Sequence, residues 1–319
     1  MSNTPHIAVT GAAGFIGSRL VGDLRREHPD WTITALDNFY LGDIHEIEDV
    51  AVEDVDIRHR GQLEEILTGA DVVIHLAAIS GVDDCDEQHD LAYETNVVGT
   101  NNVAYVCQQT GAAMAFPFSM AVLGDPDEFP ITSEMARDPL NWYGKTKVLG
   151  EAAVDAMARG SFPAHQFMIA NLYGEHSVGE QTVSKETVIN FFVQRALAGK
   201  PLTVYEPGSQ SRNFVHVTDV ANAFLRGTEQ LLEKRDRGET GTRKFEVASN
   251  EDPSVMEVAE IVAKTAREEC GLETEVELVE NPRSGETLVD EFSVETSTIR
   301  EELDWQPQRS IEESVRDLL

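Results

Sequence analysis

The sequence predicts an α/β protein built on a doubly wound parallel sheet, with a smaller C-terminal α/β region. Three observations support this fold class. Short apolar runs that suit strands alternate with longer helical runs through the first half of the chain, and a glycine-rich turn joins the first strand to the first helix. After Asn171 the alternation becomes looser. Regular alternation is typical of a parallel sheet covered by helices on both faces.

The expected elements of the first half follow one another in this alternating order. Strands are predicted at 7–9, 32–36, 50–52, 72–76, 113–119 and 165–170, and helices near 15–27, 62–67, 91–109 and 143–159. In the second half, helices are predicted near 187–198, 219–232 and 255–270, with short strands between them. The polar stretch 233–244 is predicted to be a solvated loop.

The turn after the first strand carries three glycines. Gly11, Gly14 and Gly17 are spaced as Gly-x-x-Gly-x-x-Gly, which differs from the commoner Gly-x-Gly-x-x-Gly pattern of dinucleotide-binding proteins. The first glycine permits a tight turn, the second lets the backbone approach a pyrophosphate, and the third lets the helix pack closely on the strand. Amides at the helix N-terminus then face the phosphates. The residues predicted to bind a dinucleotide here are Gly11, Gly14, Phe15, Ile16 and Gly17.

An acidic residue ends the second predicted strand. Asp37 lies 20 residues beyond Gly17 and is followed by Asn38. A carboxylate at this distance can accept both ribose hydroxyls of an adenosine. The same charge repels a 2′-phosphate, so the sequence predicts NAD as the cofactor in preference to NADP.

A tyrosine and a lysine four residues apart begin the helix predicted near 143. Tyr143 and Lys147 project from the same face of that helix. A phenol ordinarily titrates near ~10, and a fixed ammonium beside it stabilises the phenolate. The spacing alone also occurs by chance in many helices. Together with the dinucleotide signals, however, it predicts a pair that transfers a proton.

Further signals fall in order between these two motifs. They are Asp56 and Ile57, the run His75 to Ala78, Asn96, and Ser119. From Ile7 to about Leu319 the chain resembles the extended short-chain dehydrogenase/reductase family, in its nucleotide-sugar epimerase/dehydratase branch. The resemblance implies that a Rossmann-type NAD-binding domain covers 1–171 and a mainly substrate-binding region covers 172–319. It leaves open whether later segments return to the first domain.

The resemblance also implies roles for these residues. Asp56 and Ile57 would flank the adenine, and Leu76, Ala77, Ala78 and Asn96 would lie beside the cofactor. Ser119, Tyr143 and Lys147 would be the catalytic set, with the last two also contacting NAD. The alternative for Ser119 is a polar residue that only ends a buried strand. His75 is expected to be a core histidine.

Substrate residues are implied in the second half. Arg212 and Arg283 stand where the family holds a nucleotide diphosphate, and a guanidinium suits this because its planar fork bonds phosphate oxygens in pairs. The alternative is that each arginine pairs with a nearby carboxylate. Asn171 matches an asparagine on the substrate side, or is an asparagine in a turn. Met120 and Ala121 occupy positions where dehydratases and decarboxylases carry an acid, so those reactions are disfavoured.

These residues together predict an NAD-dependent nucleotide-sugar 4-epimerase-like enzyme that acts by reversible hydride transfer at the sugar C4. A nucleotide-sugar reductase or sugar dehydrogenase would use the same three catalytic residues and release an oxidised or reduced product. A non-catalytic NAD-binding protein is the less favoured alternative, because such a protein needs none of Ser119, Tyr143 and Lys147. The family resemblance further implies a homodimer that pairs through the helices near Leu91 and Tyr143.

Composition limits the partners and the setting. The chain has 57 acidic and 25 basic residues, a formal charge of −32, and such a surface repels nucleic acid and anionic membranes. The charge predicts a halophilic protein, because concentrated salt screens the repulsion. Three cysteines without Cys-x-x-Cys spacing predict neither disulfides nor zinc, and no metal is expected. No leader or membrane-length apolar run is recognised, so the expected location is the cytoplasm.

Overall fold

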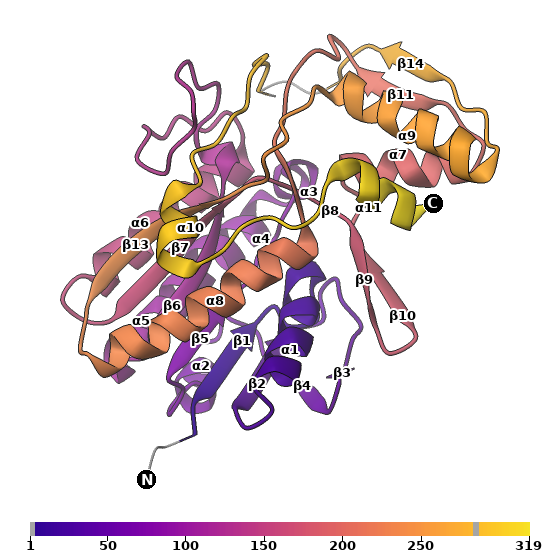
Figure 1. Cartoon of the computed structure of the whole chain (residues 1–319). Coiled ribbons are helices and arrows are strands. Elements are labelled where there is room, and N and C mark those ends of the chain that lie inside the picture. The colour runs from indigo at the N-terminus through magenta and orange to yellow at the C-terminus, as the bar shows by residue number, and fades with distance from the viewer. Residues whose placement is uncertain (1–3, 283–286) are drawn as a thin grey trace.

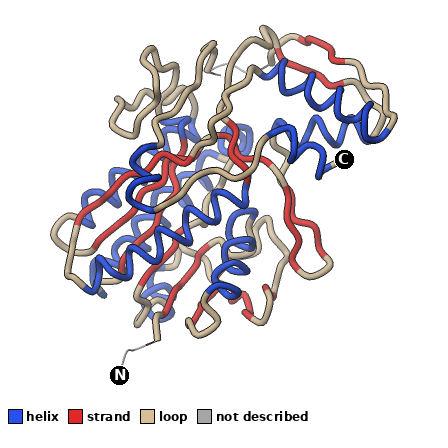
Figure 2. The backbone as a smooth tube through the Cα atoms, in the orientation of Figure 1, coloured by secondary structure: helices blue, strands red, loops and turns tan. Residues whose placement is uncertain are grey.

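A computed structural model describes residues 4–282 and 287–319 of the chain. Its centre is an eight-stranded sheet in the order β13-β7-β6-β5-β1-β2-β4-β3, parallel throughout except for β3, which pairs antiparallel with β4. In Figure 2 the strands of this sheet, in red, lie between helices in blue. The strands are β1 (His6–Thr10), β2 (Thr32–Asp37), β3 (Glu46–Ile47), β4 (Val50–Asp54), β5 (Val72–His75), β6 (Ala113–Ser119), β7 (Pro163–Ile169) and β13 (Gly241–Val247).

Helices cover both faces, which confirms the predicted doubly wound α/β class. Helices α1 and α8 pack side by side on one face (Figure 1), whereas α5 and α6 pack together against the other. The helices that accompany the sheet are α1 (Phe15–Glu27), α2 (Arg60–Ile66), α3 (Val82–Glu87), α4 (His89–Tyr93), α5 (Thr100–Thr110), α6 (Trp142–Ala158), α8 (Val217–Asp236) and α10 (Ser297–Leu303).

The strand order reverses at β1, because β2 lies on one side of it and β5 on the other. The register pairs Thr10 with Leu36 and with His75, so three strands end side by side at the glycine turn. Crevices at such a switch point are where open α/β sheets bind ligands.

A second group of elements packs around its own apolar core. Helices α7 (Val188–Leu197), α9 (Val255–Cys270) and α11 (Ile311–Leu318) enclose residues such as Phe192, Val204 and Val258 beside the strand pair β11–β14. The remaining short strands are β8 (Asn171–Tyr173), β9 (Glu175–Val178), β10 (Gln181–Ser184), β11 (Leu202–Tyr205), β12 (Phe214–His216) and β14 (Val276–Val279).

Two parts of the structure differ from the sequence-based expectation. The predicted loop 233–244 is wrong at both ends, because α8 continues to Asp236 and β13 begins at Gly241. The last turn of α8 is fixed by Arg235, which pairs with Asp71 at 2.8 Å. Strand β13 carries Arg243 and Lys244 because it is an edge strand, where charged side chains are common. The helix predicted near 91–109 is interrupted by a π-helical segment, η1 (Glu94–Gly99).

Cys85 and Cys107 are buried free thiols, and Cys270 is an exposed one. Among the described residues, no group of three or more metal-binding side chains is clustered. A search of those same residues finds no helix that combines the length and apolar character needed to cross a bilayer.

Candidate active site

A cavity of about 1010 Å³ opens at the carboxyl ends of the sheet strands. One side of it is the glycine turn and the loops after β2 and β5, and the other side is formed by the β9–β10 hairpin and α7. The predicted site residues that line it are Gly11, Gly14, Phe15, Ile16, Gly17, Asp37, Asn38, Ile57, Leu76, Ala77, Ala78, Ser119, Tyr143, Lys147 and Asn171.

The glycine turn has room for nothing larger than hydrogen at two positions. Gly11 adopts φ +72°, and a Cβ built there would lie 2.5 Å from the amide nitrogen of Ala77. A Cβ at Gly17 would lie 2.0 Å from the carbonyl oxygen of Gly11. The helix α1 can therefore begin directly against the turn, with its N-terminal amides facing the cavity.

Asp37 fastens this turn to the loop that follows β2. One carboxylate oxygen accepts from the amide of Ala13 at 3.0 Å, and the other accepts from the amide of Phe39 at 2.9 Å. Burial raises the pKa of Asp37, and the hydrogen bonds from Phe39 and Ala13 oppose that rise. A carboxylate has about four acceptor sites and the backbone amides of Ala13, Phe39 and Asn38 use three of them, so Asp37 can still accept a hydrogen bond from a ligand.

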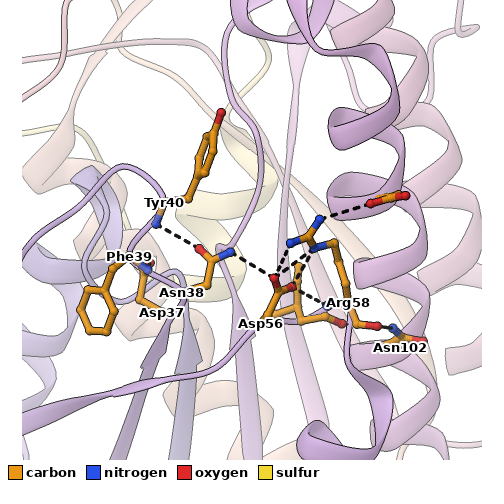
Figure 3. A network of polar contacts seen from close by, with 9 residues as sticks. Asp37, Asn38, Phe39, Tyr40, Asp56, Arg58 and Asn102 are labelled. Carbon is orange, nitrogen blue, oxygen red and sulfur yellow. Dashed lines mark hydrogen bonds and ion pairs between the residues drawn. The ribbon is translucent and has the colours of Figure 1, made fainter.

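Asp56 stands behind the cavity wall instead of lining it. Figure 3 shows its carboxylate between Asn38 and Arg58. The Arg58 guanidinium donates to it through Nε at 3.0 Å and Nη2 at 2.6 Å, and these bonds hold the pKa of Asp56 down at about 2. Arg58, which does line the cavity, also reaches Glu94 at 3.2 Å. Asp56 thus orients Arg58, and the arginine is the group that a ligand would meet.

Ser119 and Tyr143 meet where the end of β6 approaches the start of α6. Ser119 is the last residue of β6, and its side chain accepts from the amide of Ala121 at 3.2 Å. Helix α6 is capped by Asn141, whose side chain accepts from the amide of Gly144 at 2.9 Å. A Cβ at Gly144 would lie 2.6 Å from the carbonyl oxygen of Ala121, so glycine allows the close approach.

Burial controls the titration of this pair. It raises the pKa of Tyr143 to about 12, against a lowering effect from the hydrogen bond with Ser119. It lowers the pKa of Lys147 to about 8. The Lys147 ammonium lies 5.8 Å from the centre of the Tyr143 ring. Desolvation is therefore the largest effect on the phenol in the protein alone, and the expectation that Lys147 lowers the pKa of Tyr143 stays a prediction.

Asn96 lies outside the cavity lining, although it was expected beside the cofactor. It is buried in the π-helical segment, and its side chain accepts from the amide of Ile79 at 2.8 Å. Its Nδ2 donates to the carbonyl of Ile79 at 2.9 Å and to the hydroxyl of Thr146 at 3.0 Å. Asn96 thereby ties the loop after β5 to the helix that carries Tyr143 and Lys147.

Of the two arginines expected to bind substrate, Arg212 is described, and it is not among the residues that line the cavity. The Arg212 side chain donates to the carbonyls of Ser211 at 2.8 Å and Thr287 at 2.5 Å. Arg283 lies outside the described residues. Asn171 does line the cavity, and its Nδ2 donates to the carbonyl of Asn213 at 3.1 Å.

His75 is a satisfied core histidine, as expected. It is buried at the end of β5, where its ring nitrogens contact the hydroxyls of Thr10 at 2.7 Å and Thr100 at 3.0 Å. Among the cavity-lining residues that sequence reasoning missed are three polar ones, Arg58, Ser80 and Lys185. Arg58 could have been found from its place directly after Asp56-Ile57, and Lys185 from the scarcity of lysine in this chain.

The chain matches a protein-family model, several known protein sequences and several solved structures along most of its length. A sequence model of the NAD dependent epimerase/dehydratase family matches residues 7–245. The putative UDP-glucose 4-epimerase of Methanocaldococcus jannaschii is 29% identical, covering 97% of this chain and 96% of its own length. UDP-glucose 4-epimerase 1 of Oryza sativa subsp. japonica is 27% identical, covering 98% of this chain and 93% of its own length. The solved structure of MoeE5 in complex with UDP-glucuronic acid and NAD has a TM-score of 0.81 at 26% identity, covering 97% of this chain and 96% of that one.

Proposed function

The chain belongs to the NAD dependent epimerase/dehydratase family, and from this premise we propose that it is an NAD-dependent nucleotide-sugar 4-epimerase. The observation that carries the proposal is the meeting of Ser119, Tyr143 and Lys147 in the wall of one cavity that also contains the glycine turn. The test is whether the purified protein interconverts a nucleotide sugar and its 4-epimer without net change in NAD.

The residues present fit NAD. The steric limits at Gly11 and Gly17 leave a turn that a pyrophosphate can approach, and the Asp37 carboxylate keeps acceptor capacity for ribose hydroxyls. We propose that Asn38, Ile57 and Arg58 contact the adenosine part, with Asp56 acting through Arg58. Leu76, Ala77 and Ala78, in the loop after β5, would lie along the part of NAD that is farther from the adenosine. Asn96 would hold this loop in place.

The chemistry follows from three side chains. When bound, oxidised NAD supplies a hydride acceptor and a positive ring charge that favours the phenolate. Tyr143 takes the proton from the sugar 4-hydroxyl as C4 is oxidised, and returns it after the 4-keto sugar has turned over. Ser119 shares a hydrogen bond with that hydroxyl, and the Lys147 ammonium supports the charge on the phenolate.

We propose that the substrate is a nucleotide-diphosphate sugar, as in the UDP-sugar complex of the structural relative. Asn171, at the start of β8, lines the cavity and is proposed to contact the substrate. For Arg212 and Arg283 the diphosphate role stays a prediction. We propose that the residues through 171 carry the cofactor site and that 172–319 carry mainly the substrate side. Three later elements return to the first part: α8 and α10 pack on the main sheet, and β13 is its edge strand.

The closest alternative is a nucleotide-sugar reductase or sugar dehydrogenase, which would use the same three catalytic residues. The two activities differ in whether the cofactor is regenerated within one turnover. A non-catalytic NAD-binding protein fits less well, because binding alone does not explain why a serine, a tyrosine and a buried lysine line the same cavity.

Cofactor choice gives a testable prediction. NAD is expected to bind far more tightly than NADP, because Asp37 accepts from ribose hydroxyls and repels a 2′-phosphate. Losing a charge-assisted hydrogen bond costs roughly 1.5–3 kcal/mol, so Asp37→Ala should weaken NAD binding about tenfold to a hundredfold. Isothermal titration of both proteins with both cofactors measures this. Equal affinities of the unaltered protein for NAD and NADP would contradict the assignment.

We also propose a homodimer that pairs through α5 and α6. The apolar residues expected at this contact are Val97, Val98, Val148, Leu149 and Val154. Val98, on the segment η1 that leads into α5, and Leu149, on α6, are exposed, Val148 is half-buried, and Val97 and Val154 are buried. In concentrated salt, sedimentation should give about twice 35.2 kDa. Leu149→Glu should dissociate the dimer, and Leu197→Glu, an equally exposed site on α7, should not. A monomer of the unaltered protein would contradict the proposal.

The charge of −32 supports a further proposal, that the protein works in a salt-rich cytoplasm. Carboxylates such as Asp43, Asp90 and Glu312 are exposed on different elements, so the negative charge surrounds the molecule instead of forming one docking face. Concentrated salt shortens the range of repulsion between them to a few ångströms. The buried free thiols of Cys85 and Cys107 are compatible with a reducing compartment.

A further inference from the structure

Lys185 is a cation in the cavity wall that the proposed mechanism does not use. It follows β10 and lies two residues before Thr187, the N-cap residue of α7. Its Nζ donates to the Ser80 hydroxyl at 2.7 Å and to the Ser80 carbonyl at 3.0 Å. An ammonium has three protons to donate, so one remains for a ligand.

The partners of Lys185 are unusual for this protein because they are neutral. Of the seven lysines, Lys145, Lys200 and Lys264 are exposed, and Lys234 and Lys244 pair with carboxylates. Within residues 4–282 and 287–319, Lys147 and Lys185 are the two lysines that are shielded from solvent without an ion pair. Both line the same cavity.

Shielding a lysine from water without a counter-charge is costly, and here it happens in a chain with 57 acidic residues. Burial lowers the pKa of Lys185, and Asp84, the carboxylate that most opposes this, is exposed and makes no ion pair with it. Because the Lys185 ammonium makes no ion pair with a carboxylate among the described residues, it is available to an anionic ligand.

Lys185 stands at the reacting end of the cavity. Lys185 holds Ser80, and the preceding residue, Ile79, packs with Cys85 and Tyr143 in one small cluster. Its anchor, Ser80, lies two residues after Ala78 in the loop that faces Lys147. A ligand group that meets Lys185 should therefore belong to the sugar and not to the diphosphate.

We infer that Lys185, anchored by Ser80, recognises a carboxylate on the sugar ring, so that the preferred substrates are nucleotide-diphosphate uronic acids. The inference rests on the proposed function for the orientation of the sugar. A hydrogen bond from an ammonium to a carboxylate is shorter and roughly twice as strong as one to a neutral hydroxyl. Thr187 lines the same cavity, and its buried hydroxyl has no hydrogen-bond partner within the described residues.

The test compares binding of UDP, UDP-glucose and UDP-glucuronic acid to the NAD-loaded protein by calorimetry at one salt concentration. The unaltered protein should bind the uronic acid at least about tenfold more tightly than UDP-glucose. Lys185→Gln should reduce this ratio by about tenfold to a hundredfold, and Lys185→Arg should keep most of it. Lys200→Gln removes an exposed lysine on the other end of α7 and should leave the ratio unchanged.

Two results would overturn the inference. If Lys185→Gln weakens all three ligands equally, the cation serves the diphosphate; if it changes none of them, Lys185 only fixes the Ser80 loop. Should Lys185→Gln not fold, Ser80→Ala keeps the cation but frees it, and the ratio should then fall roughly threefold. Because binding is measured, a protein that discriminates between these ligands but does not epimerise them would contradict the proposed function and not this inference.

Discussion

The Tyr143→Phe protein is expected to bind NAD normally and to lose nearly all epimerisation. The phenyl ring fills the same space beside Cys85 and Trp142 but has no proton to exchange with the sugar hydroxyl. Removing a positioned acid or base typically costs about 10²–10⁴ in rate. Initial rates from a coupled product assay, with NAD affinity measured in parallel, would give the loss. Tyr93→Phe, which changes an exposed tyrosine on α4, is the matched control.

Ser119→Ala should be slower but not inactive, because Ser119 supports the reaction without carrying the proton. The loss of one positioned hydrogen-bond partner costs roughly 10²–10³ in rate. The same substitution removes the hydrogen bond that lowers the pKa of Tyr143, so the pH-rate profile should move to higher pH. Full activity of Tyr143→Phe would contradict the mechanism, and an unmoved profile in Ser119→Ala would contradict its serine part.

Mild acid should destabilise the fold, through four buried histidines. Burial lowers the pKa of His75 and His165 to about 3 and that of His176 and His216 to about 4, from an ordinary value of 6.5. The folded state therefore favours the neutral rings, and this stability is fully present above pH 6.5 and is lost as the pH falls toward 4. Each histidine should lower the free energy of unfolding at pH 5.5 by about 1.4 kcal/mol relative to its value at pH 7.5.

Urea unfolding at the two pH values measures this effect, and His165→Phe isolates one part of it. His165 packs edge-on against the rings of both Phe167 and Phe245, so phenylalanine suits its surroundings. Repulsion among surface carboxylates weakens over the same pH range and acts in the opposite direction, so the comparison must be between variants. In His165→Phe, the difference in unfolding free energy between pH 7.5 and pH 5.5 should shift by about 1.4 kcal/mol, because one buried histidine is gone. The exposed His59→Gln should show the same difference as the unaltered protein. Identical pH dependence in all three proteins would exclude buried histidines as its cause.

The sequence predicted best those elements whose ends are marked by local chemistry. Helix α9 is bounded by a capping box between Ser254 and Glu257 and by Gly271 in a left-handed conformation, and its predicted ends agree with the structure. The glycine turn could also be predicted from the sequence, because Gly11 and Gly17 occupy positions where no side chain fits. The pairing of Tyr143 with Lys147 could be predicted from the sequence, because helical spacing alone places them on one face.

Features that depend on distant contacts could not be read in this way. The strand β13 was missed because Arg243 and Lys244 suggest a loop until pairing with β7 is known. The π-helical segment leaves no mark in composition, and the role of Asn96 emerges only when Ile79 and Thr146 lie next to it. Lys185 belongs to a segment with turn-like composition, and only the fold brings it to Ser80.

The most direct test of the account follows product and cofactor together in one reaction. The purified protein with bound NAD is given a UDP-sugar, the 4-epimer is followed by chromatography, and absorbance at the reduced-nicotinamide band is recorded. We expect many turnovers of 4-epimer, in both directions, with no stoichiometric change in absorbance, because each hydride removed from C4 is returned to it. Build-up of reduced cofactor in step with an oxidised sugar, without 4-epimer, would contradict the epimerase assignment and favour the dehydrogenase.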